Sequence, residues 1–330
     1  MTSTPLAAST RARHGFVPAR PANAIVLAIF IALQPLLFML FQQYGHDNEE
    51  YLRFFEIRDD GPSYLEPLWL AYATAMNWLG FSSAESMLAG MACAMSLLAG
   101  YLLFRMQAGV KHPLRLALLL GLLLSYQVSA LGGALRQGVS LFLICIFLVT
   151  WRMPALLLSA SAHWSGMFYL PLLFRRITTA VAFMILAAAS LTYFLLQSRT
   201  DIAFLGLLMN RLESYINIEG TAEAGRLLGL ILVKAALGAI LLSNRKIVLS
   251  TAANRQVGML IIAAPFLQLL LALSNNMVVV DRGGMLLDPF VLVGTAILIR
   301  QSSAWWLVMI SALILQKLAT RLLILFITAS

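Results

Sequence analysis

The sequence is a succession of apolar runs, each close to the length at which an α-helix crosses a bilayer. A helix needs about 20 predominantly apolar residues to span about 30 Å of hydrocarbon. Hydrophobic residues make up 61% of the 330 residues and charged residues only 11%, which is more apolar surface than a soluble domain can bury. The pattern therefore predicts an all-α, polytopic membrane protein. The runs are 24–41, 84–104, 113–131, 133–150, 177–197, 226–243, 257–274, 285–299 and 303–320.

Two further apolar runs, 67–80 and 153–174, leave the predicted number of transmembrane helices between nine and eleven. The first is short and amphipathic. The second is long enough to span but is interrupted by Pro154, His163 and Pro171. Both are therefore expected to be re-entrant, broken or interfacial segments.

The basic residues favour nine crossings, because Lys and Arg collect in cytoplasmic loops. Residues 1–23 contain three arginines and no acid, which is typical of a basic cytoplasmic tail. With that tail inside and nine crossings, every basic turn also faces the cytoplasm, whereas eleven crossings would put the cluster at 105–115 outside. Residues 24–330 then form a single integral membrane domain.

Charge and cysteine content exclude several other classes of protein. The 23 Lys and Arg exceed the 14 Asp and Glu by nine, but they are scattered between apolar runs, so no nucleic-acid partner is expected. Cys93 and Cys145 both lie in apolar runs, which excludes a disulfide framework and a CxxC site. The sequence contains no phosphate-binding, dinucleotide, zinc-protease or serine-hydrolase motif.

Two long loops, 42–66 and 198–225, are predicted to lie outside and to carry most of the acids. Seven of the 14 acids lie between Asp47 and Glu66, and four more lie between Asp201 and Glu223. Acids collect in translocated loops for topological reasons alone. Long loops on one face are also where a polytopic enzyme would bind a bulky polar substrate.

Ionisable residues at or within apolar runs are costly unless they serve a site, and Arg136, His163 and Glu66 are the main candidates. Lys234 also lies within an apolar run, where it is expected either to snorkel or to pair. Arg136 heads the run 133–150, and its forked guanidinium at a helix N-terminus suits a phosphate or carboxylate. His163 is the only histidine within an apolar run and suits a general base or a hydrogen-bonding group. Glu66 precedes Pro67. The structural alternatives are a snorkelling Arg136, a His163 bonded across helices, and a Glu66 that only favours a helix N-terminus.

Other candidate site residues lie beside further charged or aromatic residues. Asp281 and Arg282, followed by two glycines, are predicted to lie in a turn between spans, as an anion ligand or as a self-paired turn. Arg211 and Tyr215 in the second outer loop combine charge with rings, as carbohydrate sites do. The aromatic residues in and around the first outer loop do the same, and an interfacial aromatic belt is the alternative interpretation for them. They are Tyr44, Tyr51, Tyr64, Trp69 and Tyr72.

Five short pieces of sequence occur in a definite order along residues 24–300. They are Gly45–Tyr51, Glu66–Leu68, Leu135–Gly138, His163–Ser165 and Asp281–Arg282. Two of them, 135–138 and 163–165, are the most specific. Taken together, these pieces resemble the EpsG-like branch of the Wzy-type polysaccharide polymerases. Trp164 stands where that family leads one to expect Tyr or Phe, and two glycines follow Arg282 where apolar and aromatic residues are usual.

The resemblance implies a bacterial inner-membrane enzyme that joins undecaprenyl-diphosphate-linked oligosaccharide repeat units on the outer, periplasmic face. Such enzymes serve exopolysaccharide, capsule and O-antigen biosynthesis. No metal or cofactor is implied, because the lipid diphosphate is the leaving group. The bilayer, a chain-length regulator and a flippase are its expected partners. The residues and the resemblance together give His163, Arg136 and Glu66 as catalytic candidates. The substrate-binding candidates are Asp47, Tyr51, Gln137, Arg211, Tyr215, Asp281 and Arg282.

Two other functions fit the same residues. A transporter or flippase of a lipid-linked or polar substrate would also have broken helices such as 153–174, although no inverted repeat is visible. An O-antigen ligase-like enzyme would likewise need Arg and His at its donor site.

Overall fold

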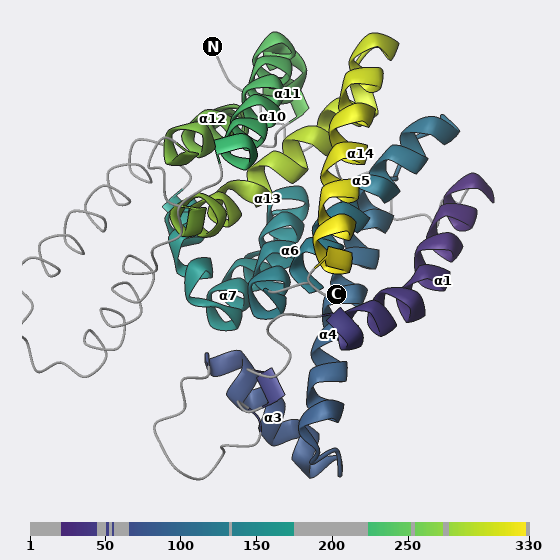
Figure 1. The fold of residues 1–330 in the computed structure, drawn as a ribbon, viewed down its shortest axis with the longest axis vertical. Coiled ribbons are helices and arrows are strands. Elements are labelled where there is room, and N and C mark those ends of the chain that lie inside the picture. The colour runs from purple at the N-terminus through teal and green to yellow at the C-terminus, as the bar shows by residue number, and fades with distance from the viewer. Residues whose placement is uncertain are drawn as a thin grey trace, which may run out of the picture.

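The computed structural model describes residues 21–44, 51–52, 55, 66–131, 134–174, 224–251, 255–272 and 277–327. Within these residues every regular element is a helix (Figure 1). The helices are α1 (Pro21–Tyr44), α3 (Pro67–Trp78), α4 (Ala84–Met106), α5 (Pro113–Leu131), α6 (Leu135–Thr150), α7 (Met153–Ala162), the 3₁₀ helix η2 (Trp164–Phe174), α10 (Ala224–Ser243), α11 (Arg245–Thr251), α12 (Arg255–Ala272), α13 (Met277–Gln301) and α14 (Ala304–Ile327).

Five of these helices have segments long and apolar enough to cross a membrane. A sixth span is possible if α10 and α11, which are bent by 74° against each other, are counted as one. The prediction of an all-α polytopic membrane protein is confirmed. The predicted run 177–197 lies outside the described residues, so the count of nine crossings stays a prediction. The five segments are Pro21–Met39, Ala84–Met106, Pro113–Leu131, Arg255–Ala272 and Gly283–Gln301.

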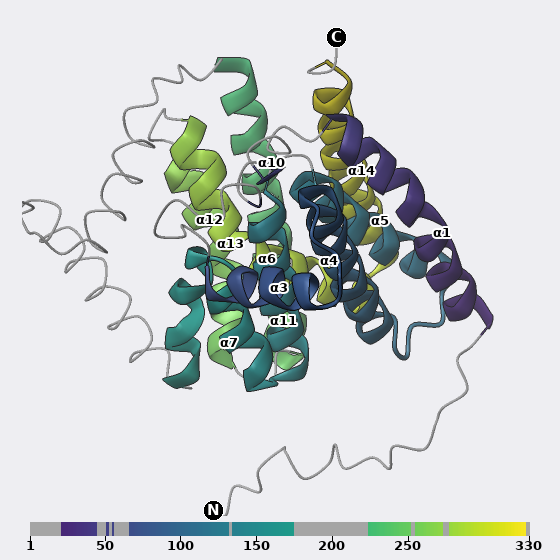
Figure 2. The ribbon, with the colours of Figure 1, turned by 90° about the horizontal axis from the view of Figure 1, so that it is seen from below.

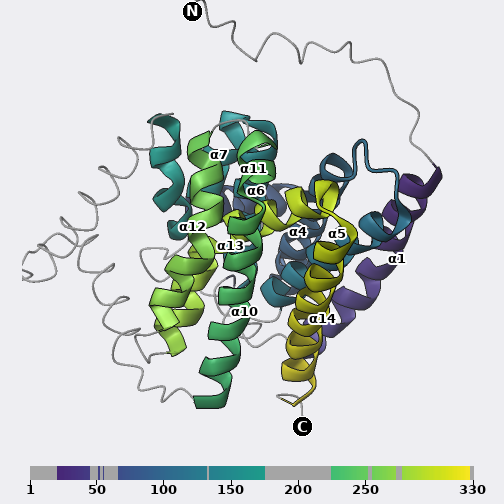
Figure 3. The ribbon, with the colours of Figure 1, turned by 90° about the horizontal axis from the view of Figure 1, so that it is seen from above.

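The helices form two groups around α6 and α13. Helices α1, α4, α5 and α14 lie on one side, and α10, α11 and α12 lie on the other (Figures 1 and 3). Helix α6 packs against α4, α7 and α13, which places its side chains among the most buried in the protein. Seen from below, α3 runs crosswise to the long helices (Figure 2).

Close contacts between helices use small and polar residues, as is usual in membranes. Gly138 of α6 faces Ala130 of α5 and Met95 of α4 so closely that a methyl group there would overlap both. Buried Gln127 of α5 donates to Gln34 of α1 at 2.6 Å and to the Ser96 hydroxyl of α4 at 3.1 Å. These contacts fix α6 and its neighbours in one register.

The two ambiguous runs both prove to be short or broken. Helix α3 has 12 residues, which span only about 18 Å at about 1.5 Å per residue. The run 153–174 divides at His163, whose backbone is extended with φ −159° and ψ 141°, between the 10-residue α7 and η2. The predicted break within this run is therefore confirmed.

The predicted turn at Asp281–Arg282 is wrong, because the backbone of both residues belongs to the helix α13. The two glycines that suggested a turn serve close packing instead. A Cβ on Gly283 would press on Leu271, and one on Gly284 would overlap the side-chain amide of Gln268, so both allow α12 to approach. The helix that contains the span predicted at 285–299 accordingly starts earlier, at Met277.

Candidate active site

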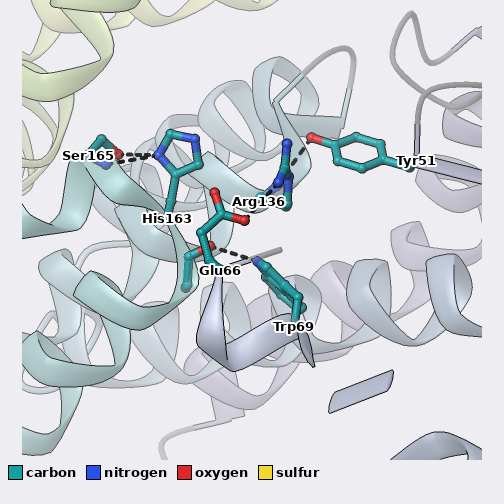
Figure 4. A network of polar contacts seen from close by, with 7 residues as sticks. Tyr51, Glu66, Trp69, Arg136, His163 and Ser165 are labelled. Atoms are coloured by element: carbon teal, nitrogen blue, oxygen red, sulfur yellow. Dashed lines mark hydrogen bonds and ion pairs between the residues drawn. The ribbon is translucent and has the colours of Figure 1, made fainter. Parts of the chain in front are cut away.

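The ends of three helical elements lie close together, and they bring three ionisable residues to one place. Glu66 stands directly before α3, Arg136 lies in the first turn of α6, and His163 occupies the break between α7 and η2. In Figure 4 the side chains of these three residues point toward one another. The residues implied as catalytic thus share one site, although 97 positions separate the first from the last.

Glu66 and Arg136 form a short ion pair. The Arg136 Nη1 atom lies 2.7 Å from Glu66 Oε2, and the two side chains are only 14% and 2% exposed. Pro67 follows Glu66 and holds its backbone extended, with φ −60° and ψ 149°. The carboxylate does not cap α3, so it is available to face Arg136. A buried pair of this kind is costly to form from water, which makes it a poor device for stability and a good candidate for function.

Tyr51 supports Arg136 from the other side. The Arg136 backbone N–H donates to the Tyr51 hydroxyl at 3.5 Å, and the guanidinium carbon lies 5.5 Å from the centre of the ring. At that distance the face of the ring attracts the cation. Tyr51 is buried, so the structure places this predicted substrate-binding residue beside Arg136 as a structural neighbour.

His163 is held by the residue two positions later. Its Nδ1 atom lies 2.6 Å from the Ser165 hydroxyl and accepts from the Ser165 backbone N–H at 3.1 Å. The Gly166 N–H donates to the His163 carbonyl at 2.8 Å, and a Cβ on Gly166 would overlap the Ser159 carbonyl. The glycine therefore lets η2 fold tightly against the end of α7, which fixes the imidazole.

The sequence profile of the EpsG family matches residues 25–330, which is nearly the whole chain. The chain belongs to the EpsG family. The resemblance seen in the short motifs is therefore confirmed for the family, whose EpsG-like members are polysaccharide polymerases of the Wzy type. No curated protein and no solved structure matches the chain.

A pair of serines places Arg136 and His163 at the same height in the helix bundle. The Ser140 and Ser159 hydroxyls lie 2.8 Å apart, and each also donates to the other's carbonyl at 3.2 Å. Ser140 follows Arg136 by four residues on α6, and Ser159 precedes His163 by four on α7. Since four residues make about one helical turn, both candidate side chains stand one turn beyond the serine contact.

Trp69 ties α3 to the same place. Its indole N–H donates to the carbonyl of Ala162, directly before His163, at 2.7 Å. The side chain is buried, as is Glu66 three positions earlier. Sequence patterns assigned Trp69 to the aromatic residues of the first outer loop, with no hint of this bond. Ser165 was similarly visible only as part of the motif, because a side chain that orients another leaves no signal of its own.

The other substrate-binding candidates are distributed differently. Gln137 is buried, and its side-chain oxygen has no hydrogen-bond partner among the described residues. Asp47, Arg211 and Tyr215 lie outside the described residues, as do the side chains of Asp281 and Arg282. The structure therefore brings together the catalytic candidates, Tyr51 and the start of α6, and leaves the roles of the outer loops as predictions.

A second, half-buried ion pair lies elsewhere in the bundle. Lys234 of α10 and Asp288 of α13 approach to 3.8 Å, and their side chains are 12% and 15% exposed. The sequence left Lys234 open between snorkelling and pairing, and the structure shows that it pairs. Within the described residues no group of three or more His, Cys, Asp or Glu is arranged to hold a metal ion.

Proposed function

We propose that this protein is a polysaccharide polymerase that joins oligosaccharide repeat units carried on undecaprenyl diphosphate. It works at the outer face of the bacterial inner membrane, in exopolysaccharide or capsule assembly. The growing chain moves from its lipid diphosphate to a sugar hydroxyl of the next lipid-linked unit. The observation that carries this proposal is the buried Glu66–Arg136 pair beside His163 at the ends of three helical elements.

Arg136 is suited to bind the donor diphosphate. A guanidinium keeps its charge and can give two parallel hydrogen bonds to one phosphate. The first turn of α6 adds backbone N–H groups and the positive end of the helix dipole. Negative charge grows on the diphosphate as it leaves, so donors that are already in place stabilise the transition state.

The reaction forms one bond and breaks another. The acceptor hydroxyl oxygen bonds to the anomeric carbon of the donor sugar, and the bond from that carbon to the diphosphate oxygen breaks. The electron pair leaves with the diphosphate, and the hydroxyl proton must pass to a base. Glu66 and His163 are the two groups of the described site that could take it.

The surroundings suit a long polyprenyl chain. Exposed apolar side chains lie at and just beyond the C-terminal end of α3: Trp78 is 88% exposed, Leu79 71% and Phe81 53%. Met167 and Phe168 of η2 are exposed as well. Apolar side chains on both elements that frame the site favour contact with lipid, so a lipid-linked substrate could reach Arg136 sideways from the bilayer.

The direct test is polymerisation by the purified protein in vesicles. Synthetic undecaprenyl-diphosphate-linked repeat units are added, and the products are separated by length. A ladder with steps of one repeat unit, with release of undecaprenyl diphosphate, is expected from the wild type and not from Arg136→Ala. Movement of the lipid-linked unit between leaflets without joining would favour a flippase. Single transfer to a different lipid acceptor without a ladder would favour a ligase.

A further inference from the structure

The hydrogen bonds of His163 fix which of its ring nitrogens carries the proton. A backbone N–H can only donate, so the Ser165 N–H at 3.1 Å requires a lone pair on Nδ1. The Ser165 hydroxyl at 2.6 Å can turn its hydrogen toward the same atom. A neutral imidazole has one proton, and it must therefore lie on Nε2.

The backbone enforces this arrangement independently of the serine side chain. Ser165 lies in the first turn of η2, and that turn is closed by the bond from Gly166 N–H to the His163 carbonyl. The lack of a side chain on Gly166 lets the turn lie against Ser159. Protonation of Nδ1 would set two N–H groups against each other, so the site disfavours both the other tautomer and the imidazolium ion.

We infer that His163 donates a hydrogen bond through Nε2–H to the leaving diphosphate and is not the base for the acceptor hydroxyl. Ser165 is the positioning residue that sets this tautomer. The inference rests on the proposed function and deepens it. In Figure 4 the ring faces the Glu66–Arg136 pair, the place at which we expect the diphosphate to bind.

The base is then Glu66. In the step, the hydroxyl proton passes to the Glu66 carboxylate while the electron pair of the broken bond stays on the diphosphate. His163 gives a hydrogen bond and loses no proton. Among the described residues, Glu66 and Arg136 lie on the side that the ring faces, and Ser165 lies at Nδ1 (Figure 4). A diphosphate on Arg136 adds negative charge beside Glu66 and weakens its ion pair, which makes the carboxylate a better proton acceptor.

The tautomer of His163 can be determined by a measurement that does not depend on enzymatic activity. Nitrogen-15 NMR of histidine-labelled full-length protein in nanodiscs separates protonated from unprotonated ring nitrogens. Signals that vanish in His163→Gln belong to His163, and the exposed His112→Gln is the matched control. At neutral pH a protonated Nε2 with an unprotonated Nδ1 is expected. A protonated Nδ1, alone or in an imidazolium, would overturn the inference.

The role is then measured as the rate of repeat-unit joining in vesicles. His163→Ala should lower the rate by about 10²–10³-fold, the usual cost of one lost transition-state donor. Gln can place a donor where Nε2–H was, so His163→Gln should stay within about tenfold of the wild type and share its pH profile. Ser165→Ala keeps the backbone N–H and should also stay within about tenfold.

A base would behave in the opposite way. His163→Gln would then be as inactive as His163→Ala, and the wild-type rate would fall about tenfold for each pH unit below the histidine titration, with that fall absent from the variant. Equal amounts of folded protein in the membrane are required for each comparison. If the wild type joins no units at all, the proposed function fails together with the donor role, while the NMR spectrum still decides the tautomer.

Discussion

The ion pairs Glu66–Arg136 and Lys234–Asp288 differ in where their helices place them. Glu66 and Arg136 meet at 2.7 Å where two elements begin, next to backbone N–H groups at the start of α6. Lys234 and Asp288 meet at 3.8 Å from positions inside α10 and α13. An arginine at a helix end can exchange its carboxylate for a ligand without moving a helix. A pair between two helix interiors joins the helices instead.

The largest expected effect is at Arg136. Arg136→Ala should lower repeat-unit joining by about 10²–10³-fold, because a donor to the leaving diphosphate is lost. The joining rate of Arg136→Lys should lie between those of the wild type and Arg136→Ala, since lysine keeps the charge but loses the forked geometry. Initial rates in vesicles measure both, with the exposed Arg105→Ala as the control. A wild-type rate from Arg136→Ala would leave this pair without a functional role.

The second largest effect on the joining rate is expected at Glu66. Glu66→Gln keeps the shape and can still accept a hydrogen bond from Arg136, but it cannot take a proton at neutral pH. A general base contributes about 10²–10⁴-fold, and a loss in that range is expected. The exposed Glu85→Gln is the control and should match the wild type. If Glu66→Gln stayed within twofold, the carboxylate would only position Arg136.

The Lys234–Asp288 pair should affect stability and not chemistry. Lys234→Met or Asp288→Asn alone leaves one charge without its partner and should lower the unfolding free energy by on the order of 2 kcal/mol. The double variant should regain much of that loss. Unfolding in detergent measures the stability, and joining rates are compared per folded molecule. If the single variants stayed stable but lost joining activity, the Lys234–Asp288 pair would also have a role in the reaction.

The smallest effect is expected at Trp69. Trp69→Phe removes the bond to the Ala162 carbonyl and keeps most of the packing, so a loss of about 1 kcal/mol in stability is expected. The joining rate should fall only a few-fold, because Glu66 is less well placed relative to His163. Trp78→Phe, at the exposed end of the same helix, should have no effect on either measurement. An unchanged Trp69→Phe would mean that α3 is positioned by other contacts.

Much of the fold could be predicted, because most apolar runs have about the length of a helix that crosses the bilayer. The candidate residues stood out for a related reason: a charge at the end of an apolar run needs an explanation. That reasoning selected Glu66, Arg136 and His163 individually. It could not pair Glu66 with Arg136, because 70 positions separate them and only tertiary packing brings them together.

The failures have physical causes as well. Glycine pairs usually mark turns, but Gly283 and Gly284 lie inside α13 and make room for α12. Tyr51 and Trp69 looked like aromatic residues of an outer surface, and their hydrogen bonds into the site depend on elements distant in the chain. Periodicity and composition carry no information on such partners.

The length of α6 has a consequence for the bilayer itself. Its 16 residues reach only about 24 Å at about 1.5 Å per residue. The hydrocarbon core is about 30 Å thick, so a helix anchored at the predicted cytoplasmic turn near Arg152 stops about 6 Å short of the opposite boundary. Arg136 then lies below the plane of the neighbouring head groups. In the proposed topology, a diphosphate bound there would be drawn inward, and the outer leaflet would thin locally to meet the protein.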